Sequence, residues 1–464
     1  MESRKQSPRG PTTPFAPLPP ELPTTSPRRR TLAAVLLFAM TVLAALAGTG
    51  HGPPVWIAGL AAWGAAVLLW PQLARAQKRQ ALLLAGAGAV AFGVALVRGG
   101  SPSLLGLLTQ NTALLGMLAA VSFLRLLRTP EAGSAGLPKG RGALWRTLGA
   151  VHVLGAVINL SAVFIMADRI GADGKPRQDQ AAVLVRAFLA AALWSPFFAA
   201  TAVALTYAPG ASPLGLAASG MALAVVLLWL AGRDTERSSG NRAADFIGYP
   251  MQASALKVPA VLAVLVGAGH WVVPEWAALA VISLAALAVV CVVVLVQQGA
   301  RAGGHALYGH VRDRLPGMSG ELVLFLSAAV FASGLRAVMD SGGLWLPFSA
   351  FGVTEAALVL AAMILLAALG IHAVITIAMA SAWLAPLQPE PTLLALVFVQ
   401  SWAIGLAAGP MSGIHLALQG RYGLSAAQLA RANVRYCLQA YAAAVVWLAV
   451  IGSVLGVKLL PAWS

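Results

Sequence analysis

The sequence predicts an all-α, polytopic membrane protein with roughly ten to twelve embedded helices. A helix that spans the membrane needs about 20 apolar residues. Hydrophobic residues make up 59% of the 464 residues and charged residues only 10%, whereas soluble domains carry about 25% charged residues. From Thr31 onward, apolar blocks alternate with short polar breaks. Alternating strand patterns do not occur, so we expect helices rather than barrel strands.

The positive charge belongs to loops. The formal net charge is +16, but Lys and Arg cluster between apolar blocks, as they do in cytoplasmic loops. We therefore expect the lipid bilayer as partner and no nucleic acid. Residues 1–30 are rich in Pro, Ser and Thr and end in three arginines, which predicts a disordered, basic cytoplasmic tail.

The rest of the chain divides into two predicted transmembrane halves, residues 31–250 and 251–464. The first apolar block lacks a convincing cleavage site and is interpreted as a spanning helix. We expect a multi-pass protein of the cell inner membrane with a cytoplasmic N-terminus.

Simple alternation of crossings meets a conflict at the apolar segments 147–168 and 181–207. If both cross, the following basic loop lies outside the cell. If one crosses and the other is re-entrant, that loop returns to the cytoplasm. Re-entrant segments occur where they are buried in protein or line a cavity. The basic residues of the loop in question are Arg233, Arg237, Arg242 and Lys257.

An internal similarity links residues 185–201 to residues 399–415, 214 positions later along the chain. In each, an apolar half-helix runs into a proline at the same offset, Pro196 or Pro410. Proline removes a helical hydrogen bond and clashes with the preceding turn. A looser match places a segment opening with a histidine, His152 or His372, before each. Two broken helices are therefore predicted.

Paired, interrupted segments mark the binding site of many secondary transporters. A broken helix exposes N–H groups and the positive end of a dipole, which suit a carboxylate. The alternative is that proline and small residues only permit close helix packing. The predicted substrate-binding residues are Asn159, Ser161, Ser195, Pro196, Gly409, Pro410, Ser412, Gly413 and His415.

Two ionisable residues within apolar segments are further candidates, because charges are costly there. Arg186 would hold a carboxylate substrate or pair with an acid in the bundle. Glu355, about ten residues into segment 345–369, is the candidate for coupling to H⁺ or Na⁺. Its alternative is an acid near the membrane interface.

These blocks and the repeated broken helix resemble the ion-transporter superfamily over most of residues 80–456. That group includes divalent-anion symporters, arsenite permeases, citrate carriers and large subunits of dicarboxylate transporters. The resemblance implies two inverted repeats with discontinuous helices, a midplane site and an elevator-type movement. The paired Ser-Asn-Thr signatures of the divalent-anion symporters are absent, and Asn159-Leu-Ser161 matches one in part. The substrate therefore stays open.

Enzymatic motifs are missing, since neither a Walker loop, a nucleophile elbow nor a His-Glu-x-x-His sequence occurs. His152, His372 and His415 lie on different segments without ligand spacing, so we predict neither a metal site nor a cofactor beyond H⁺ or Na⁺.

The leading hypothesis is a secondary active transporter of a small organic anion of the carboxylate type. The alternatives are a membrane-embedded enzyme or biogenesis factor for a lipid-linked substrate, and a non-transporting subunit of a larger complex. The oligomeric state, a homodimer included, is left open.

Overall fold

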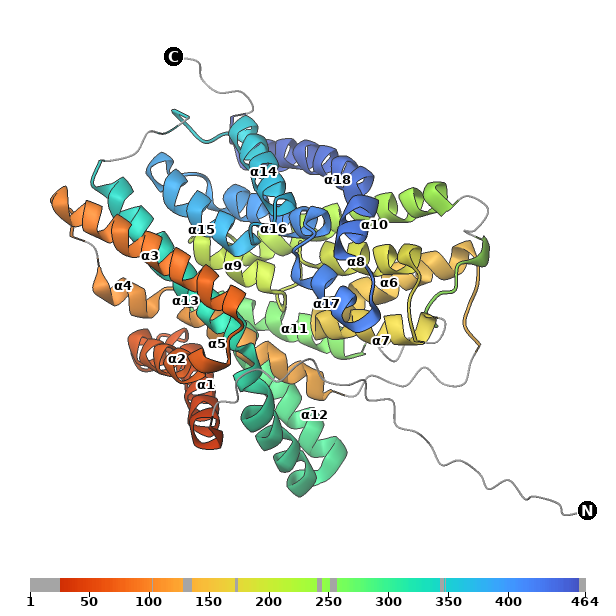
Figure 1. Ribbon diagram of the computed structural model, residues 1–464, viewed down its shortest axis with the longest axis horizontal. Helices are drawn as coiled ribbons and strands as arrows, with labels where there is room; N and C mark the ends of the chain where they lie inside the picture. The colour runs from red at the N-terminus through yellow and green to blue at the C-terminus, as the bar shows by residue number, and fades with distance from the viewer. Residues whose placement is uncertain are drawn as a thin grey trace, which may run out of the picture.

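The computed structural model describes residues 26–101, 103–127, 136–171, 174–239, 244–250, 257–342, 346 and 348–458. In this part of the chain the named elements are all helical (Figure 1), with an isolated β-bridge between Lys139 and Ile247. The predicted α-helical class is confirmed.

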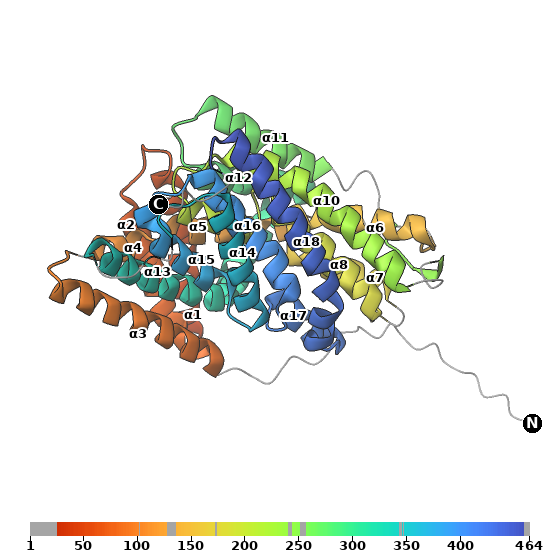
Figure 2. The same cartoon turned by 90° about the horizontal axis from the view of Figure 1, so that it is seen from above.

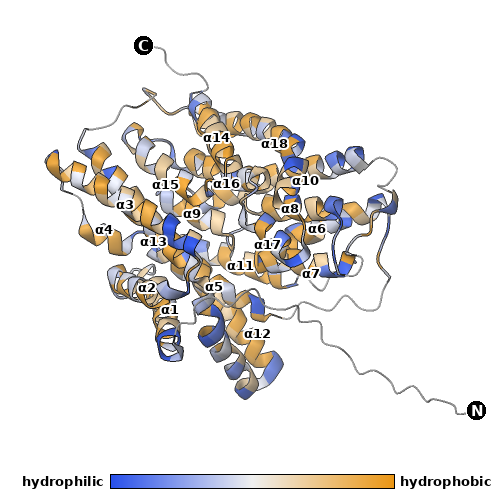
Figure 3. Ribbon diagram, viewed as in Figure 1, coloured by the Kyte–Doolittle hydropathy of each residue, from blue (hydrophilic) through white to orange (hydrophobic). Residues whose placement is uncertain are grey.

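Eight helical stretches in the described ranges are long and apolar enough to cross a membrane, and three of these contain two consecutive α-helices, namely residues 104–126, 278–340 and 391–422. Figure 3 shows apolar residues along most helices, with polar residues gathered at helix ends such as that of α12 (Ala278–Gly309). These features define a multi-pass membrane protein.

The helices form two bodies that meet side by side (Figures 1 and 2). In the first body α13 packs along α3, α1 along α2, and α5 against α1 and α12. Besides α12, its helices are α1 (Pro27–Ala47), α2 (Val55–Leu69), α3 (Arg75–Val97), α4 (Leu104–Thr109), α5 (Thr112–Ser122), α11 (Lys257–Val272) and α13 (Ser319–Asp340).

The second body is built around α16, which packs against α8, α9, α14 and α18. Packing of α13 against α15 joins it to the first body. Its members are α6 (Arg141–Ile158), α7 (Leu160–Ile170), α8 (Gln178–Ala191), α9 (Ala199–Tyr207), α10 (Pro213–Ser239), α14 (Val353–Ala368), α15 (Ala373–Leu384), α16 (Pro391–Ala408), α17 (Gly413–Tyr422) and α18 (Ala426–Val454). Each body contains helices from both predicted halves of the chain, residues 31–250 and 251–464. That these halves are repeats stays a prediction.

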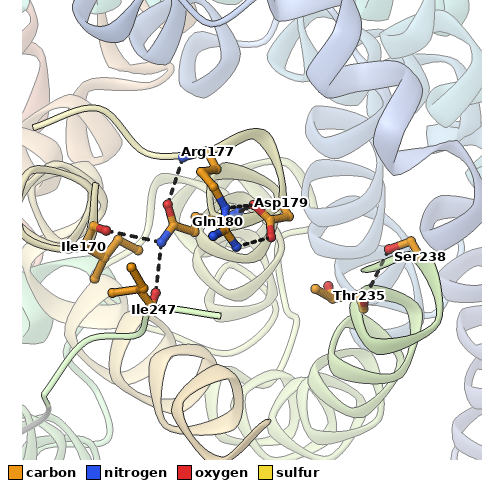
Figure 4. A network of polar contacts seen from close by, with 7 residues as sticks. All are labelled: Ile170, Arg177, Asp179, Gln180, Thr235, Ser238 and Ile247. Atoms are coloured by element: carbon orange, nitrogen blue, oxygen red, sulfur yellow. Dashed lines mark hydrogen bonds and ion pairs between the residues drawn. The ribbon is translucent and has the colours of Figure 1, made fainter. Parts of the chain in front are cut away.

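The helices α6 and α7 form a hairpin that enters and leaves at one face of the second body. The turn is Asn159, whose φ of 52° and ψ of −142° lie outside the regions that residues other than glycine usually adopt. Gln180, at the start of α8, donates its side-chain amide to the carbonyl oxygens of Ile170 (3.2 Å) and Ile247 (2.9 Å), as Figure 4 shows. The Gly140 amide bonds to the Phe246 carbonyl. Both ends of the hairpin therefore lie beside the loop that follows α10, which favours the re-entrant alternative for segment 147–168.

The helices α14 and α15 form a second hairpin, whose two ends lie beside the ends of α18 and α9. The Val353 amide, at the start of α14, bonds to the Lys458 carbonyl beyond the end of α18. Ser381 of α15 donates to the Tyr207 carbonyl at the end of α9, 2.6 Å away. Gly370, with a φ of 95°, lies in the turn. The two hairpins thus approach the centre of the body from opposite faces.

Two predicted boundaries were wrong. Pro27–Arg30, assigned to the disordered tail, form the first turn of α1, because proline at the start of a helix has a suitable φ and needs no hydrogen-bond partner. Residues 1–25 lie outside the described ranges. The predicted helix 345–369 begins at Val353, after a stretch with Ser349 and Gly352, residues typical of turns.

Candidate functional site

The two predicted breaks are present in the second body. Residues 192–198 separate α8 from α9, and residues 409–412 separate α16 from α17. Pro196 and Pro410 lie within them, in agreement with the steric effect of proline on a helix. Each break packs against the tip of the hairpin that precedes it in the chain. A break and a hairpin tip therefore meet at two places inside the body.

The first break satisfies its own polar groups. The Ser195 hydroxyl donates to the Ala156 carbonyl near the end of α6 and accepts from the Phe197 amide at 3.2 Å. Asn159 at the hairpin tip donates to the Phe197 carbonyl at 3.2 Å. Thr201 donates to the Ser195 carbonyl at 2.7 Å. The predicted hydroxyl and amide at this break are therefore engaged within the protein.

The remaining residues predicted at the first break lie on its flanks. Ser161 is in the first turn of α7, past the hairpin tip. Pro196 and Trp194 line an apolar cavity of about 440 Å³ between α9, α10, α11 and α12. Trp194 also donates to His152, in the middle of α6. His372 instead caps the start of α15, so the two histidines do not occupy corresponding places in the hairpins.

At the second break, Gly409 permits close contact with the second hairpin. A Cβ atom added at Gly409 would lie 2.7 Å from the Ala367 carbonyl oxygen, and one added at Gly370 would lie 3.2 Å from Met411 Cγ. The small residues at the break and at the hairpin tip thus bring the two backbones together.

The second break carries polar atoms without partners. Ser412 Oγ and His415 Nε2 are buried and lack a hydrogen bond within the described protein. Ser412 is the N-cap of α17, but its side chain makes no capping bond. The first amides of a helix have no intrahelical partner, so the start of α17 presents N–H groups and the positive end of its dipole. Gly413 beside them is exposed, and an anion suits such a position.

The orientation of His415 is set by its other ring nitrogen. Nδ1 lies 2.9 Å from the Gly409 carbonyl oxygen. A carbonyl oxygen can only accept, so Nδ1 carries the hydrogen of the pair. In the neutral ring Nε2 is then an acceptor that faces a buried, unpaired position.

Gln400, in the middle of α16, is a further buried polar residue. Both its amide nitrogen and its amide oxygen lack a partner, and none of the residue is exposed. Its counterpart in the internal similarity is Arg186. A buried amide without a hydrogen bond costs about 1–3 kcal/mol, and the contacts within the described protein do not offset that cost at Gln400.

Arg186 is held by protein groups. Its guanidinium lies 2.9 Å from the Asp234 carboxylate, and both side chains are buried, with 3% and 4% exposure. It also donates to Asn433 Oδ1 at 2.8 Å, to Thr235 Oγ1 at 3.3 Å and to the Ala432 carbonyl at 2.9 Å. The structure favours the predicted pairing with an acid over a free substrate anchor.

Sequence reasoning missed Asp234 and Asn433. Asp234 lies directly after Arg233 and two residues before Glu236 in a basic stretch, and acids among arginines at a helix end are the signal that was available. Asn433 lies inside α18, and the sequence around it does not indicate that it contacts Arg186.

Glu355 lies in the first turn of α14, two residues after its start, and not mid-helix as expected. Its carboxylate accepts from the Gly352 amide at 2.8 Å, which is the glutamate half of a capping box, since glycine has no side chain to form the other half. This contact accounts for a buried acid without a coupling role, and the coupling assignment stays a prediction. Within the described residues, three or more His, Cys, Asp or Glu side chains do not gather as a metal site would require.

Neither a family model nor a curated protein matches the chain. A solved structure, the YdaH transporter of Alcanivorax borkumensis, matches with 15% identity and a TM-score of 0.43 over 81% of this chain and 98% of that one. Similarity at this level carries no inference about function, and the resemblance to the ion-transporter superfamily stays a prediction.

Proposed function

We propose that the protein is a secondary active transporter of a small organic anion of the carboxylate type, coupled to H⁺ or Na⁺. One observation carries the proposal: Ser412 Oγ and His415 Nε2 are buried and unpaired at the uncapped start of α17. Each unpaired buried group costs about 1–3 kcal/mol. A carboxylate that bonds to Ser412 and to the free amides of α17 would remove part of that cost.

The opposed hairpins support alternating access. One hairpin reaches its break from the face at the start of α8, and the other from the face at the start of α14. We propose that these two units are the inverted repeats. Since each hairpin tip covers one break, displacement of either tip would open the site to one face at a time.

The sidedness follows from the basic residues. Arg30, at the start of α1, donates to the Asp313 carbonyl in the turn between α12 and α13. Gln72, between α2 and α3, donates to the Pro316 carbonyl in that same turn. The start of α1 and the connection between α2 and α3 therefore share one face with Arg312 and Arg314. By the positive-inside rule, we propose that this face and the N-terminus lie in the cytoplasm of a bacterial inner membrane.

The test is ligand binding to the purified full chain. Formate, acetate, succinate and citrate are screened by thermal shift with and without Na⁺, since a ligand stabilises the folded state by mass action. The strongest ligand is then used in radiolabelled counterflow in proteoliposomes. We expect at least one anion to raise the melting temperature and to exchange.

Matched variants locate the site. In Gly413→Trp the indole would fill the space before α17 and abolish binding and counterflow, with unchanged elution on size exclusion. Gly420→Trp, in the same helix, is the control, because a Cβ atom at either glycine meets no atom within 4 Å. Full binding by Gly413→Trp would remove the assigned site, and a lack of response to all four anions would refute the proposed function.

A further inference from the structure

We infer that His415 is the proton-carrying residue of the anion site, so that each bound carboxylate is accompanied by one proton on Nε2. The inference rests on the proposed function and deepens it by choosing H⁺ as the coupling ion. It begins with the ring geometry. Because Nδ1 donates to the Gly409 carbonyl oxygen at 2.9 Å, a further proton can bind to the ring only at Nε2.

The chemistry of the ligand then requires that proton. An ionised carboxylate only accepts hydrogen bonds, and neutral His415 also presents an acceptor at Nε2. Two acceptors in a buried position repel each other and share no hydrogen. When a proton from water binds Nε2, the ring becomes an imidazolium, which donates a charge-assisted hydrogen bond to the carboxylate. Proton and anion then enter together as a neutral pair.

The neighbouring helices provide no other counter-ion. None of α16, α17 and α18 contains Asp or Glu. On α8, which also packs against α17, Asp179 pairs with Arg177. On the second hairpin, Glu355 caps α14. A protonated His415 therefore depends on the incoming anion for its opposite charge.

The cations on these helices are directed elsewhere. Arg186 pairs with Asp234 and lies over the ring of Tyr436. Arg421, at the far end of α17, pairs with Asp168 and contacts the Tyr422 hydroxyl. The other ionisable groups on α18 are also engaged or exposed. Arg431 is exposed and Arg435 lies 3.4 Å from Asp234, whereas Cys437 donates to the Ile404 carbonyl and Tyr441 to the Ala357 carbonyl. The geometry thus leaves the imidazole as the group that faces the site.

The test counts protons. Binding of acetate, succinate and citrate to the full chain is measured by titration calorimetry at about pH 7.5, above the usual range of histidine titration, in two buffers of different ionisation enthalpy. The difference in heat gives the protons taken up per anion. We expect one proton for the wild-type chain. We expect none for His415→Gln, whose amide can hydrogen bond but cannot be protonated. His305→Gln, at an exposed position of α12, should behave as the wild type.

The two proposals fail in different ways. If an anion binds to the wild type without proton uptake, or if uptake persists in His415→Gln, the inference is wrong and the transporter proposal stands. If none of the three anions binds, the proposed function fails as well. Should His415→Gln not fold, nitrogen NMR of the ¹⁵N-histidine-labelled wild type decides. The ring of His415 should carry hydrogen at Nδ1 without ligand and at both nitrogens with it, and a ring that stays neutral would overturn the inference.

Discussion

Asn111 donates a hydrogen bond to the hydroxyl of Tyr207 at 2.8 Å, across the contact between the two bodies. Asn111 occupies the left-handed region between α4 and α5, and the same amide donates to the Phe325 carbonyl of α13 at 2.8 Å. Tyr207 ends α9, directly after the first broken helix. A buried polar contact therefore joins the first body to the broken-helix body.

Tyr207→Phe tests the strength of that contact. It removes the hydroxyl and leaves the ring packing, so we expect a loss of about 1 kcal/mol, as for an ordinary buried hydrogen bond. The melting temperature of the purified chain should fall modestly. Tyr308→Phe, at a residue that is 59% exposed, is the control, and equal effects of the two substitutions would contradict a specific role of the buried hydroxyl.

The buried pair of Arg186 and Asp234 predicts a larger effect. Asp234→Asn leaves the guanidinium without its counter-charge inside the body, which costs about 3–5 kcal/mol. We expect a large fall in melting temperature. The double substitution Arg186→Met with Asp234→Leu removes both charges and should recover much of the loss. A double variant no more stable than Asp234→Asn would show that the pair contributes through its shape or its other hydrogen bonds.

The broken helices could be predicted because the effect of proline is local. Pro196 and Pro410 interrupt their helices through their own rings, and the residues around them repeat that pattern. The partners of the broken segments could not be predicted in the same way. Ser195 and the Ala156 carbonyl are 39 residues apart along the chain, and their contact depends on how the hairpin folds back.

The difference between the two breaks also lies beyond the local pattern. Ser195 and Ser412 each lie beside a proline break, yet Ser195 is engaged and Ser412 Oγ is unpaired. Whether a hydroxyl is used by the protein depends on the carbonyl that the neighbouring hairpin brings near it. For Glu355, the error was in the helix boundary, because an apolar stretch that forms a turn resembles the start of a helix in composition alone.

Gly409 and Gly413 should respond differently to the same small substitution. In Gly409→Ala the new methyl group would lie 2.7 Å from the Ala367 carbonyl oxygen, whereas in Gly413→Ala it meets no atom within 4 Å. Overpacking of this kind costs about 1–3 kcal/mol. We expect a lower melting temperature for Gly409→Ala and an unchanged one for Gly413→Ala. Equal melting temperatures would contradict the close approach of the hairpin tip to the second break.

The re-entrant course of the first hairpin predicts which residues share a side of the membrane. Lys139 precedes α6 and Lys175 follows α7, whereas Lys458 follows α18 beside the start of α14. With Cys291 and Cys437 replaced by alanine, a single cysteine is placed at each lysine and labelled with a membrane-impermeant thiol reagent. Cysteines at Lys139 and Lys175 should react from the same side, in inverted vesicles, because both ends of the hairpin meet at Gln180 and Ile247.

A cysteine at Lys458 should react from the other side, in intact spheroplasts. This position serves as the control for vesicle orientation and reagent access. If residues 147–168 crossed the membrane as one helix, cysteines at Lys139 and Lys175 would react from opposite sides. That result would contradict the hairpin and, with it, the opposed arrangement on which the alternating-access proposal depends.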